Sequence, residues 1–185
     1  MFLKDENVIV LDFLSTGHAA GRKEAIAQVI GEKYFSLLEI VIKPGVSVKN
    51  GDKLYIGEGK REIVDHIKRR INSNELTSFA KSEVPFLVER IVNENEAKFV
   101  EIFNTAHPVS TRMHQLELLP GIGKKHMWSI IEERKKGKFK NFEDIKTRIN
   151  LIPDPKGSIV KRIIQEIENE DERYRLFVAG KPREY

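Results

Sequence analysis

Two proline-containing breaks lie 33 residues apart in the otherwise helical C-terminal part of this chain, and they limit the folds open to it. The first is Pro120-Gly-Ile-Gly123 and the second is Pro153-Asp-Pro-Lys156. The apolar residues around them align at the same offset, with Leu116, Leu119, Met127, Ile130 and Ile131 matching Ile149, Ile152, Val160, Ile163 and Ile164. A repeated apolar pattern around repeated breaks predicts two similar helical units that share one core.

The first break resembles a known nucleic-acid-binding motif. Its sequence, Leu116-Glu-Leu-Leu-Pro-Gly-Ile-Gly-Lys-Lys125, is similar to that of helix–hairpin–helix proteins, which hold the nucleic-acid backbone. Pro120 is expected to stop the first helix. Gly121 and Gly123 would permit unusual backbone dihedral angles and a close approach to a ligand. Ile122 would anchor the turn in the core, and no side chain is expected to read a base.

The residues after this break favour a phosphate ligand. The amides of Gly121, Gly123 and Lys125 would lie at a helix N-terminus, where unpaired N–H groups and the helix dipole attract an anion. Lys124 and Lys125 oppose that dipole at a cost of roughly a few tenths of a kcal/mol each, and a bound phosphate would remove the conflict. A helical corner without a ligand explains the glycines but leaves the two lysines unexplained.

The second break departs from the motif. Asp154 stands in place of the first glycine, Pro155 has no N–H to offer, and Lys156 stands in place of the second glycine. We therefore expect the second unit to be structural, packed against the first. Trp128 aligns with Lys161, and burial is the expectation for a lone tryptophan.

The positive charge of the chain is concentrated around the first break. The net charge is +4, yet residues 1–110 sum to −1 and residues 151–185 to zero, whereas residues 111–150 carry ten basic and five acidic side chains. Such a concentration is typical of a surface that meets a polyanion, although a solvated helix face is the alternative. The predicted nucleic-acid-binding residues are Gly121, Ile122, Gly123, Lys124, Lys125, Arg112, His126 and Lys138.

The N-terminal part has strand-like patterns, so an α+β fold is expected. Residues 8–13, 25–30 and 34–42 predict strands, and residues 46–57 predict an Asn-Gly turn followed by a short strand. These strands would close into a small OB-like or SH3-like β-barrel over residues 1–57. From residue 58, the spacing of Ile63, Ile67 and Ile71 predicts an amphipathic helix. Residues 58–108 would be connecting helices, with one of them starting at Pro85. Residues 109–185 would form a tandem helix–hairpin–helix domain with a degenerate second hairpin.

Several functional classes are disfavoured. The chain has no cysteine, and its five histidines lack metal-binding spacing, so we expect no metal and no cofactor. Asp144 stands where a repair glycosylase could place a catalytic carboxylate, but Asn141-Phe-Glu-Asp144 also reads as the start of a helix. We therefore predict a noncatalytic protein, with a DNA-processing enzyme or accessory, or a protein–protein adaptor, as alternatives. No membrane-spanning run is present, and a cytoplasmic location is expected.

Four further segments, together with the hairpin, resemble the archaeal domain of unknown function 655 family. They are Val10-Leu-Asp-Phe-Leu14, Ala27-Gln-Val-Ile-Gly31, Tyr34-Phe-Ser-Leu-Leu-Glu39 and Leu54-Tyr-Ile-Gly57. The resemblance covers nearly the whole chain and implies a nucleic-acid-binding protein with an OB-like part and a tandem helix–hairpin–helix region. It also implies an archaeal source and a link with translation, which favours RNA over DNA as partner and suggests an association with the ribosome or rRNA processing. It supplies no catalytic residues.

Overall fold

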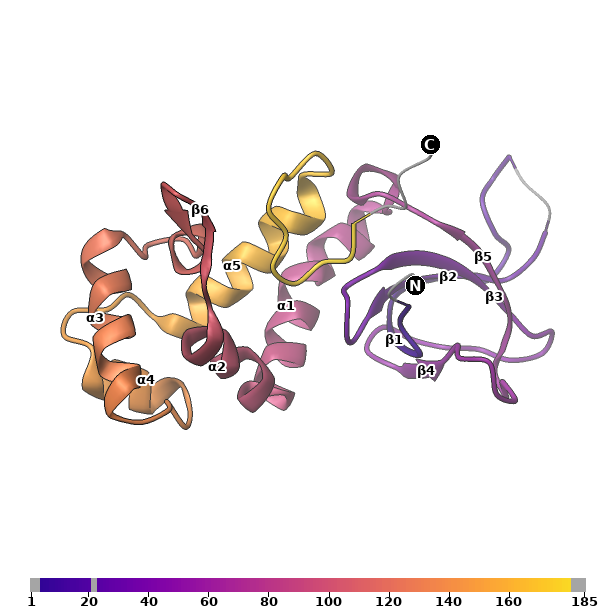
Figure 1. Ribbon diagram of the computed structural model, residues 1–185. Coiled ribbons are helices and arrows are strands. Elements are labelled where there is room, and N and C mark those ends of the chain that lie inside the picture. Colours follow the sequence, from indigo (N-terminus) through magenta and orange to yellow (C-terminus); the bar gives the residue numbers. More distant parts are fainter. Residues whose placement is uncertain (1–3, 21–22, 181–185) are drawn as a thin grey trace. The chain divides into compact units, whose positions relative to one another are not determined.

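The N-terminal part of the chain forms a curled five-stranded antiparallel sheet with the strand order β4-β1-β2-β3-β5 (Figure 1). The computed structural model describes residues 4–20 and 23–180, so the two ends of the chain, residues 1–3 and 181–185, lie outside the description. The strands are β1 (Asn7–Leu14), β2 (Ile26–Gly31), β3 (Leu37–Ile42), β4 (Lys53–Tyr55) and β5 (Val64–Arg70). Together with the helices that follow, they make a mixed α+β fold.

Alternation along the strands builds the core of the sheet. Each of the three central strands contributes two alternate residues to one buried cluster, as expected when successive side chains point to opposite faces. These residues are Val8 and Val10 of β1, Ala27 and Val29 of β2, and Ile40 and Ile42 of β3. The predicted strands over residues 8–13 and 25–30 are confirmed as β1 and β2.

Strand β5 corrects the helix predicted from residue 58. Ile63, Ile67 and Ile71 are spaced four apart, and this spacing also places residues on one face of a strand, whose period is two. Isoleucine is β-branched and packs well on a pleated surface. The segment therefore forms a strand, because it can pair with the edge of the sheet at β3. Ile67 lies opposite Ile40 across the β3–β5 pair and remains 39% exposed.

The third predicted strand begins later than expected. Phe35 adopts a positive φ of 54° in the turn before β3, and its ring is buried. Phe35 therefore belongs to the core, whereas Tyr34 beside it is half-buried and Tyr55 of β4 is 39% exposed. The hydroxyl of Tyr55 accepts a hydrogen bond from the Gly59 N–H at 3.1 Å.

The helical part begins with η1 (Ser73–Glu75) and α1 (Ser78–Glu94). Thr77 caps α1, since its hydroxyl oxygen accepts a hydrogen bond from the Ala80 N–H at 3.0 Å. The helix predicted to start at Pro85 is wrong in its boundary, because α1 begins at Ser78 and Pro85 lies inside it. The remaining elements are α2 (Glu96–Thr105), β6 (Pro108–Ser110), β7 (Met113–His114), η2 (Gln115–Leu118), α3 (Lys124–Lys136), α4 (Phe142–Arg148) and α5 (Pro155–Glu168).

The described residues divide into two compact units. One comprises the residues up to 87 together with those from 166 onward, and the other comprises residues 88–165. The aligned apolar residues of the sequence repeat are buried or half-buried, and Leu116, Leu119, Ile130, Ile149 and Ile163 are at most 1% exposed. None of the described helices is long and apolar enough to cross a membrane.

Candidate functional site

Residues 119–123, here called the glycine turn, connect η2 to α3 and are held by the core below them. Ile122 is 4% exposed, as the sequence predicts, and its N–H donates to the Leu119 carbonyl at 3.0 Å. Gly121 has a φ of +85°, a conformation that favours glycine. A Cβ atom at this position would lie 3.1 Å from Cγ of Pro153, so the second break packs against the first.

Gly123 has a different environment from Gly121. It is the N-cap of α3, and its φ of −93° with ψ of −175° is extended backbone that any residue adopts. The predicted unusual dihedral angle is therefore correct for Gly121 and wrong for Gly123. A Cβ atom at Gly123 would meet nothing within 4 Å. The fold itself does not require a glycine here, and the space beside its backbone is open to a ligand.

The N-terminus of α3 lacks the side chains that usually pair with the backbone N–H groups in the first turn of a helix. Gly123 offers no capping side chain, and the first turn of the helix contains no acidic residue. Lys124 and Lys125 are exposed, and within residues 4–20 and 23–180 neither ammonium group has an ion-pair partner. Positive charge therefore accumulates where the helix dipole is also positive.

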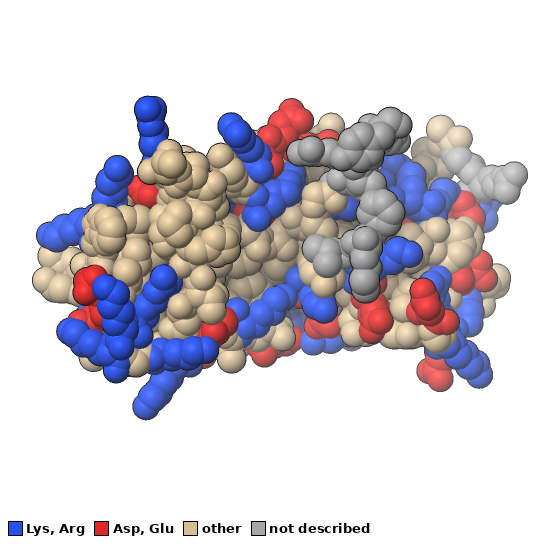
Figure 2. Space-filling view, in the orientation of Figure 1, with Lys and Arg blue, Asp and Glu red and all other residues tan. Residues whose placement is uncertain are grey.

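The C-terminal end of α3 shows the opposite arrangement. Lys135 pairs with Glu132 at 2.6 Å, and Lys136 pairs with Glu133. Figure 2 shows that blue Lys and Arg side chains outnumber red acidic ones over the part of the molecule that contains α3 and α4. The lysines at the end of the helix are paired with acids and favour its dipole, whereas Lys124 and Lys125 at the glycine turn oppose it.

Residues 149–154, here called the proline turn, connect α4 to α5. Asp154 precedes the helix, and its carboxylate accepts a hydrogen bond from the Gly157 N–H at 3.2 Å, as an N-cap does. Pro155 occupies the first helical position, where it needs no hydrogen-bond acceptor. Helix α5 thus begins at the position that aligns with Ile122, two residues earlier than in the first unit. The Ser158 hydroxyl donates to the Pro120 carbonyl at 2.7 Å and braces the glycine turn.

The structure brings only some of the other predicted site residues to this turn. His126 lies in the first turn of α3 and is half-buried. Arg112 is exposed in the tight connection between β6 and β7. Lys138 lies beyond the opposite end of α3, about 20 Å from Lys124 along the helix axis. Its ammonium group contacts Glu101 at 3.0 Å, and this hydrogen bond lowers the pKa of Glu101 below its ordinary value.

Trp128 is the residue whose surroundings differ most from expectation. Its predicted burial is wrong, because the side chain is 59% exposed on α3, one turn after Lys124. The opposite side of that helix carries Met127 and Ile130, which fill the core. The alignment of Trp128 with the polar Lys161 was the one signal in the sequence for an exposed position.

Two polar residues at helix ends have structural roles, His114 before the glycine turn and Asp144 at the start of α4. His114 is the N-cap of η2, and its Nδ1 accepts a hydrogen bond from the Leu116 N–H at 3.1 Å. Burial and the positive charge of Arg134 lower the pKa of His114 below its ordinary value. The Asp144 carboxylate accepts from the Lys140 N–H at 3.0 Å, and Asn141 caps α4 as predicted.

A second group of ionisable side chains crosses the sheet. Glu39 is 1% exposed, and its carboxylate receives hydrogen bonds from His18 at 2.7 Å, Gln28 at 3.2 Å and Arg69 at 2.9 Å. Burial raises the pKa of Glu39, but the hydrogen bonds from His18 and Gln28 and the charge of Arg69 outweigh burial and lower it overall. This network is internally satisfied and ties neighbouring strands together.

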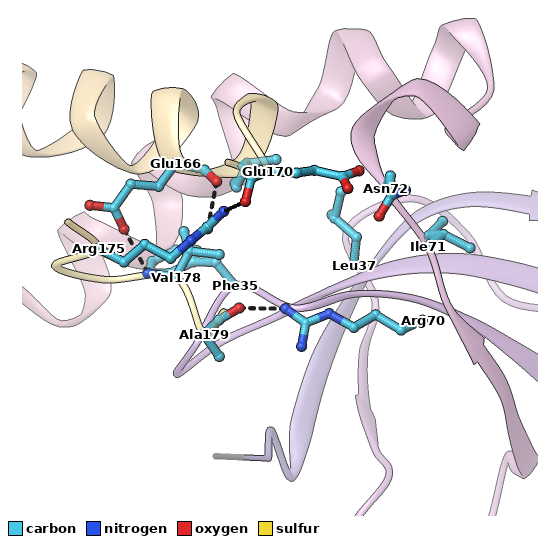
Figure 3. A pocket seen from close by; sticks show the side chains of 11 residues that line it. Phe35, Leu37, Arg70, Ile71, Asn72, Glu166, Glu170, Arg175, Val178 and Ala179 are labelled. Carbon is cyan, nitrogen blue, oxygen red and sulfur yellow. Dashed lines mark hydrogen bonds between the residues drawn. The ribbon is translucent and has the colours of Figure 1, made fainter. Parts of the chain in front are cut away.

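A small pocket lies between the sheet and the C-terminal segment of the same unit (Figure 3). Arg70 donates to the carbonyl of Ala179, and Arg175 donates to the carbonyl of Glu166 at 2.8 Å. The Glu166 carboxylate accepts from backbone N–H groups, including that of Val178 at 2.9 Å. The volume of this pocket, about 40 Å³, holds at most a few water molecules. These contacts fasten the segment to the sheet and leave no room for a larger ligand.

Within residues 4–20 and 23–180, no group of three or more His, Cys, Asp or Glu side chains could hold a metal ion. The open backbone at Gly123 and the two exposed lysines that follow make the glycine turn the strongest candidate site.

Comparison with known proteins identifies relatives in archaea. The chain is 44% identical over 173 residues to an uncharacterized protein of Methanocaldococcus jannaschii, covering 93% of this chain and 79% of that protein. A crystal structure of a protein from Archaeoglobus fulgidus, given as a member of the DUF655 family, superposes with a TM-score of 0.85 at 47% identity and covers 95% of this chain and 100% of that one. A family model described as "Protein of unknown function (DUF655)" matches residues 4–179, and the chain belongs to this family.

Proposed function

We propose that this protein binds nucleic acid without catalysing a reaction, and that it holds a backbone phosphate at the glycine turn. In this proposal η2, the glycine turn and α3 act as a helix–hairpin–helix element. The N–H groups at the start of α3 contact the phosphate, and Lys124 and Lys125 add positive charge. Ile122 contributes by anchoring the turn in the core.

The observation that carries the proposal is the unsatisfied N-terminus of α3. Three features coincide there: no capping side chain, open space beside Gly123, and two exposed lysines without acidic partners among the described residues. The missing cap and the two lysines make the helix less stable, and the open space beside Gly123 contributes nothing to packing. A phosphate would accept the free N–H groups, occupy the space and balance the lysines.

Backbone contacts do not distinguish one sequence from another, so we expect binding with little base preference from this turn. We favour RNA over DNA, because the family resemblance implies a link with translation. The carboxylate of Asp144 is held by Lys140 and by Arg148, at 3.0 and 3.4 Å, which supports a structural role for this residue.

The test is a fluorescence-anisotropy titration of the full chain with labelled single- and double-stranded RNA and DNA at two salt concentrations. Binding should weaken by about 0.9 log unit per log unit of salt for each duplex phosphate that is neutralised. The double variant Lys124→Glu, Lys125→Glu should lose most of its affinity and keep its fold, because both side chains are exposed.

A matched control reverses the same amount of charge at the other end of the helix. Lys135→Glu with Lys136→Glu should lose much less affinity, since both lysines are already neutralised by Glu132 and Glu133. Thermal unfolding of both variants verifies that they are folded. Equal losses in the two variants would assign binding to overall charge, and an unchanged affinity in the first would remove the glycine turn from the mechanism.

A further inference from the structure

The only tryptophan of the chain is exposed beside the glycine turn. Trp128 is 59% exposed, although burial of so large a side chain would contribute more to folding than burial of most others. It follows Lys124 by four residues and Lys125 by three, so the three side chains share one face of α3. This face therefore combines a flat aromatic ring with two positive charges.

The chemistry of this face selects its occupant. Lys124 and Lys125 attract a negatively charged partner, and an indole ring offers a surface for stacking. A nucleotide supplies both complements, since its phosphate is anionic and its base is planar. The Cα atoms of Lys124 and Trp128 are about 6 Å apart along the helix axis, so one nucleotide and its neighbour can occupy both groups.

We infer that Trp128 stacks on an unpaired base next to the phosphate held at the glycine turn, which makes single-stranded RNA, or an RNA loop or end, the preferred ligand. This inference rests on the proposed function. In a duplex each base face is covered by its neighbours, whereas in a single strand every base offers a free face. The exposed indole thus adds selectivity for unpaired nucleotides to a phosphate contact that has none.

The lone tryptophan also provides the measurement. Intrinsic fluorescence of the full chain is followed while a short oligouridine strand, or an RNA duplex of the same length, is added. Stacking on Trp128 should quench the emission with the single strand, and the duplex should quench it much less. Polyglutamate, which has the charge but no bases, serves as the polyanion control and should leave the emission nearly unchanged.

Affinity is measured in parallel with labelled strands and the variants Trp128→Ala and Trp128→Phe. Trp128→Ala should bind the single strand at least about fivefold more weakly, because stacking on one base contributes about 1 kcal/mol or more. Its affinity for the duplex should not change, and Trp128→Phe should recover part of the loss. Phe86→Ala removes another aromatic ring, 67% exposed on α1, and should have no effect.

The outcomes separate this inference from the proposed function. If Trp128→Ala binds the single strand as tightly as the wild type while Lys124→Glu with Lys125→Glu does not, the stacking is overturned and the phosphate contact stands. Quenching by polyglutamate as strong as that by oligouridine would also overturn the stacking and would indicate an acidic protein partner. If no nucleic acid binds at all, both proposals fail.

Discussion

The glycine turn and the proline turn each lead from a short helix into a longer one, but the two longer helices satisfy their N-termini in different ways. Helix α5 begins with Asp154, whose carboxylate caps the Gly157 N–H, and with Pro155, which has no N–H to satisfy. Helix α3 begins with Gly123 and two lysines and has neither device. One N-terminus is capped by a side chain of the chain itself, and the other has no side-chain cap.

The proline turn also supports the glycine turn. Pro153 fills the space beside Gly121, and Ser158 donates to the Pro120 carbonyl. The proline turn thus braces the glycine turn from behind. In a repeat of this kind one copy can hold the other in shape, while the other presents the site proposed above.

The largest effect on stability is expected at Gly121. Gly121→Ala should lower the free energy of unfolding by about 2 kcal/mol, because alanine is strained at positive φ and its Cβ would press on Pro153. Urea unfolding measures the change. Gly123→Ser is the matched control and should leave stability within about 0.5 kcal/mol of the wild type. Equal losses at the two glycines would contradict the distinction between them.

Giving the glycine turn the cap of the proline turn should weaken the proposed phosphate contact without harming the fold. Gly123→Asp should weaken RNA binding about tenfold, or about 1.4 kcal/mol, because the carboxylate occupies the N-terminus of α3 and repels phosphate. Its stability should stay the same or rise slightly, since aspartate caps better than glycine. Gly123→Asn provides a neutral cap of similar size and should lose less affinity. Wild-type affinity in Gly123→Asp would exclude phosphate from this position.

The reverse change should cost stability and produce no binding site. Asp154→Ala should lower the free energy of unfolding by about 1 kcal/mol through loss of the cap on α5. RNA affinity should not increase, because Pro155 still lacks the N–H that a phosphate would need. Asp154→Ser retains a capping oxygen and should recover most of the stability. A tighter complex in Asp154→Ala would show that the proline turn is a phosphate site masked by its carboxylate.

The features of the two turns that arise from local chemistry could be predicted from the sequence. The offset of 33 residues located both turns, and proline and glycine act on the backbone where they stand. The capping of α4 by Asn141 was predictable for the same reason. Helix α5 begins two residues earlier than the alignment with α3 would place it, because Asp154 caps it there.

The features that depend on distant residues could not be predicted. Residues 64–70 join the sheet because β3 offers them an edge, and nothing in their own spacing excludes a helix. Lys138 is balanced by Glu101, a partner 37 positions away, so a count of charges along the chain overstates its part in the site. The exposure of Trp128 likewise follows from which side of α3 the core covers. The OB-like barrel and the helix–hairpin–helix assignment stay predictions.

The helices that precede the two turns, η2 and α4, have caps that respond differently to pH. The expected change in stability is the smallest of the four predicted effects. Helix α4 is capped by Asn141, which does not titrate, and η2 is capped by His114, whose Nδ1 must be unprotonated to accept the Leu116 N–H. Burial and Arg134 lower the pKa of His114 in the folded state, so the unfolded chain binds a proton first as the pH falls. Stability from this group is therefore complete above the unfolded-state pKa of about 6.5 and is lost as the pH falls toward the folded-state pKa.

The variant His114→Asn gives η2 the kind of cap that α4 has and isolates this contribution. Urea unfolding at a series of pH values between about 7.5 and 5 should give a shallower decline in stability for the variant than for the wild type. Other groups titrate in both proteins, so the difference between the two curves reports His114 alone. Parallel curves would mean that folding does not change the proton affinity of His114. The cap of η2 would then be as insensitive to pH as the Asn141 cap of α4.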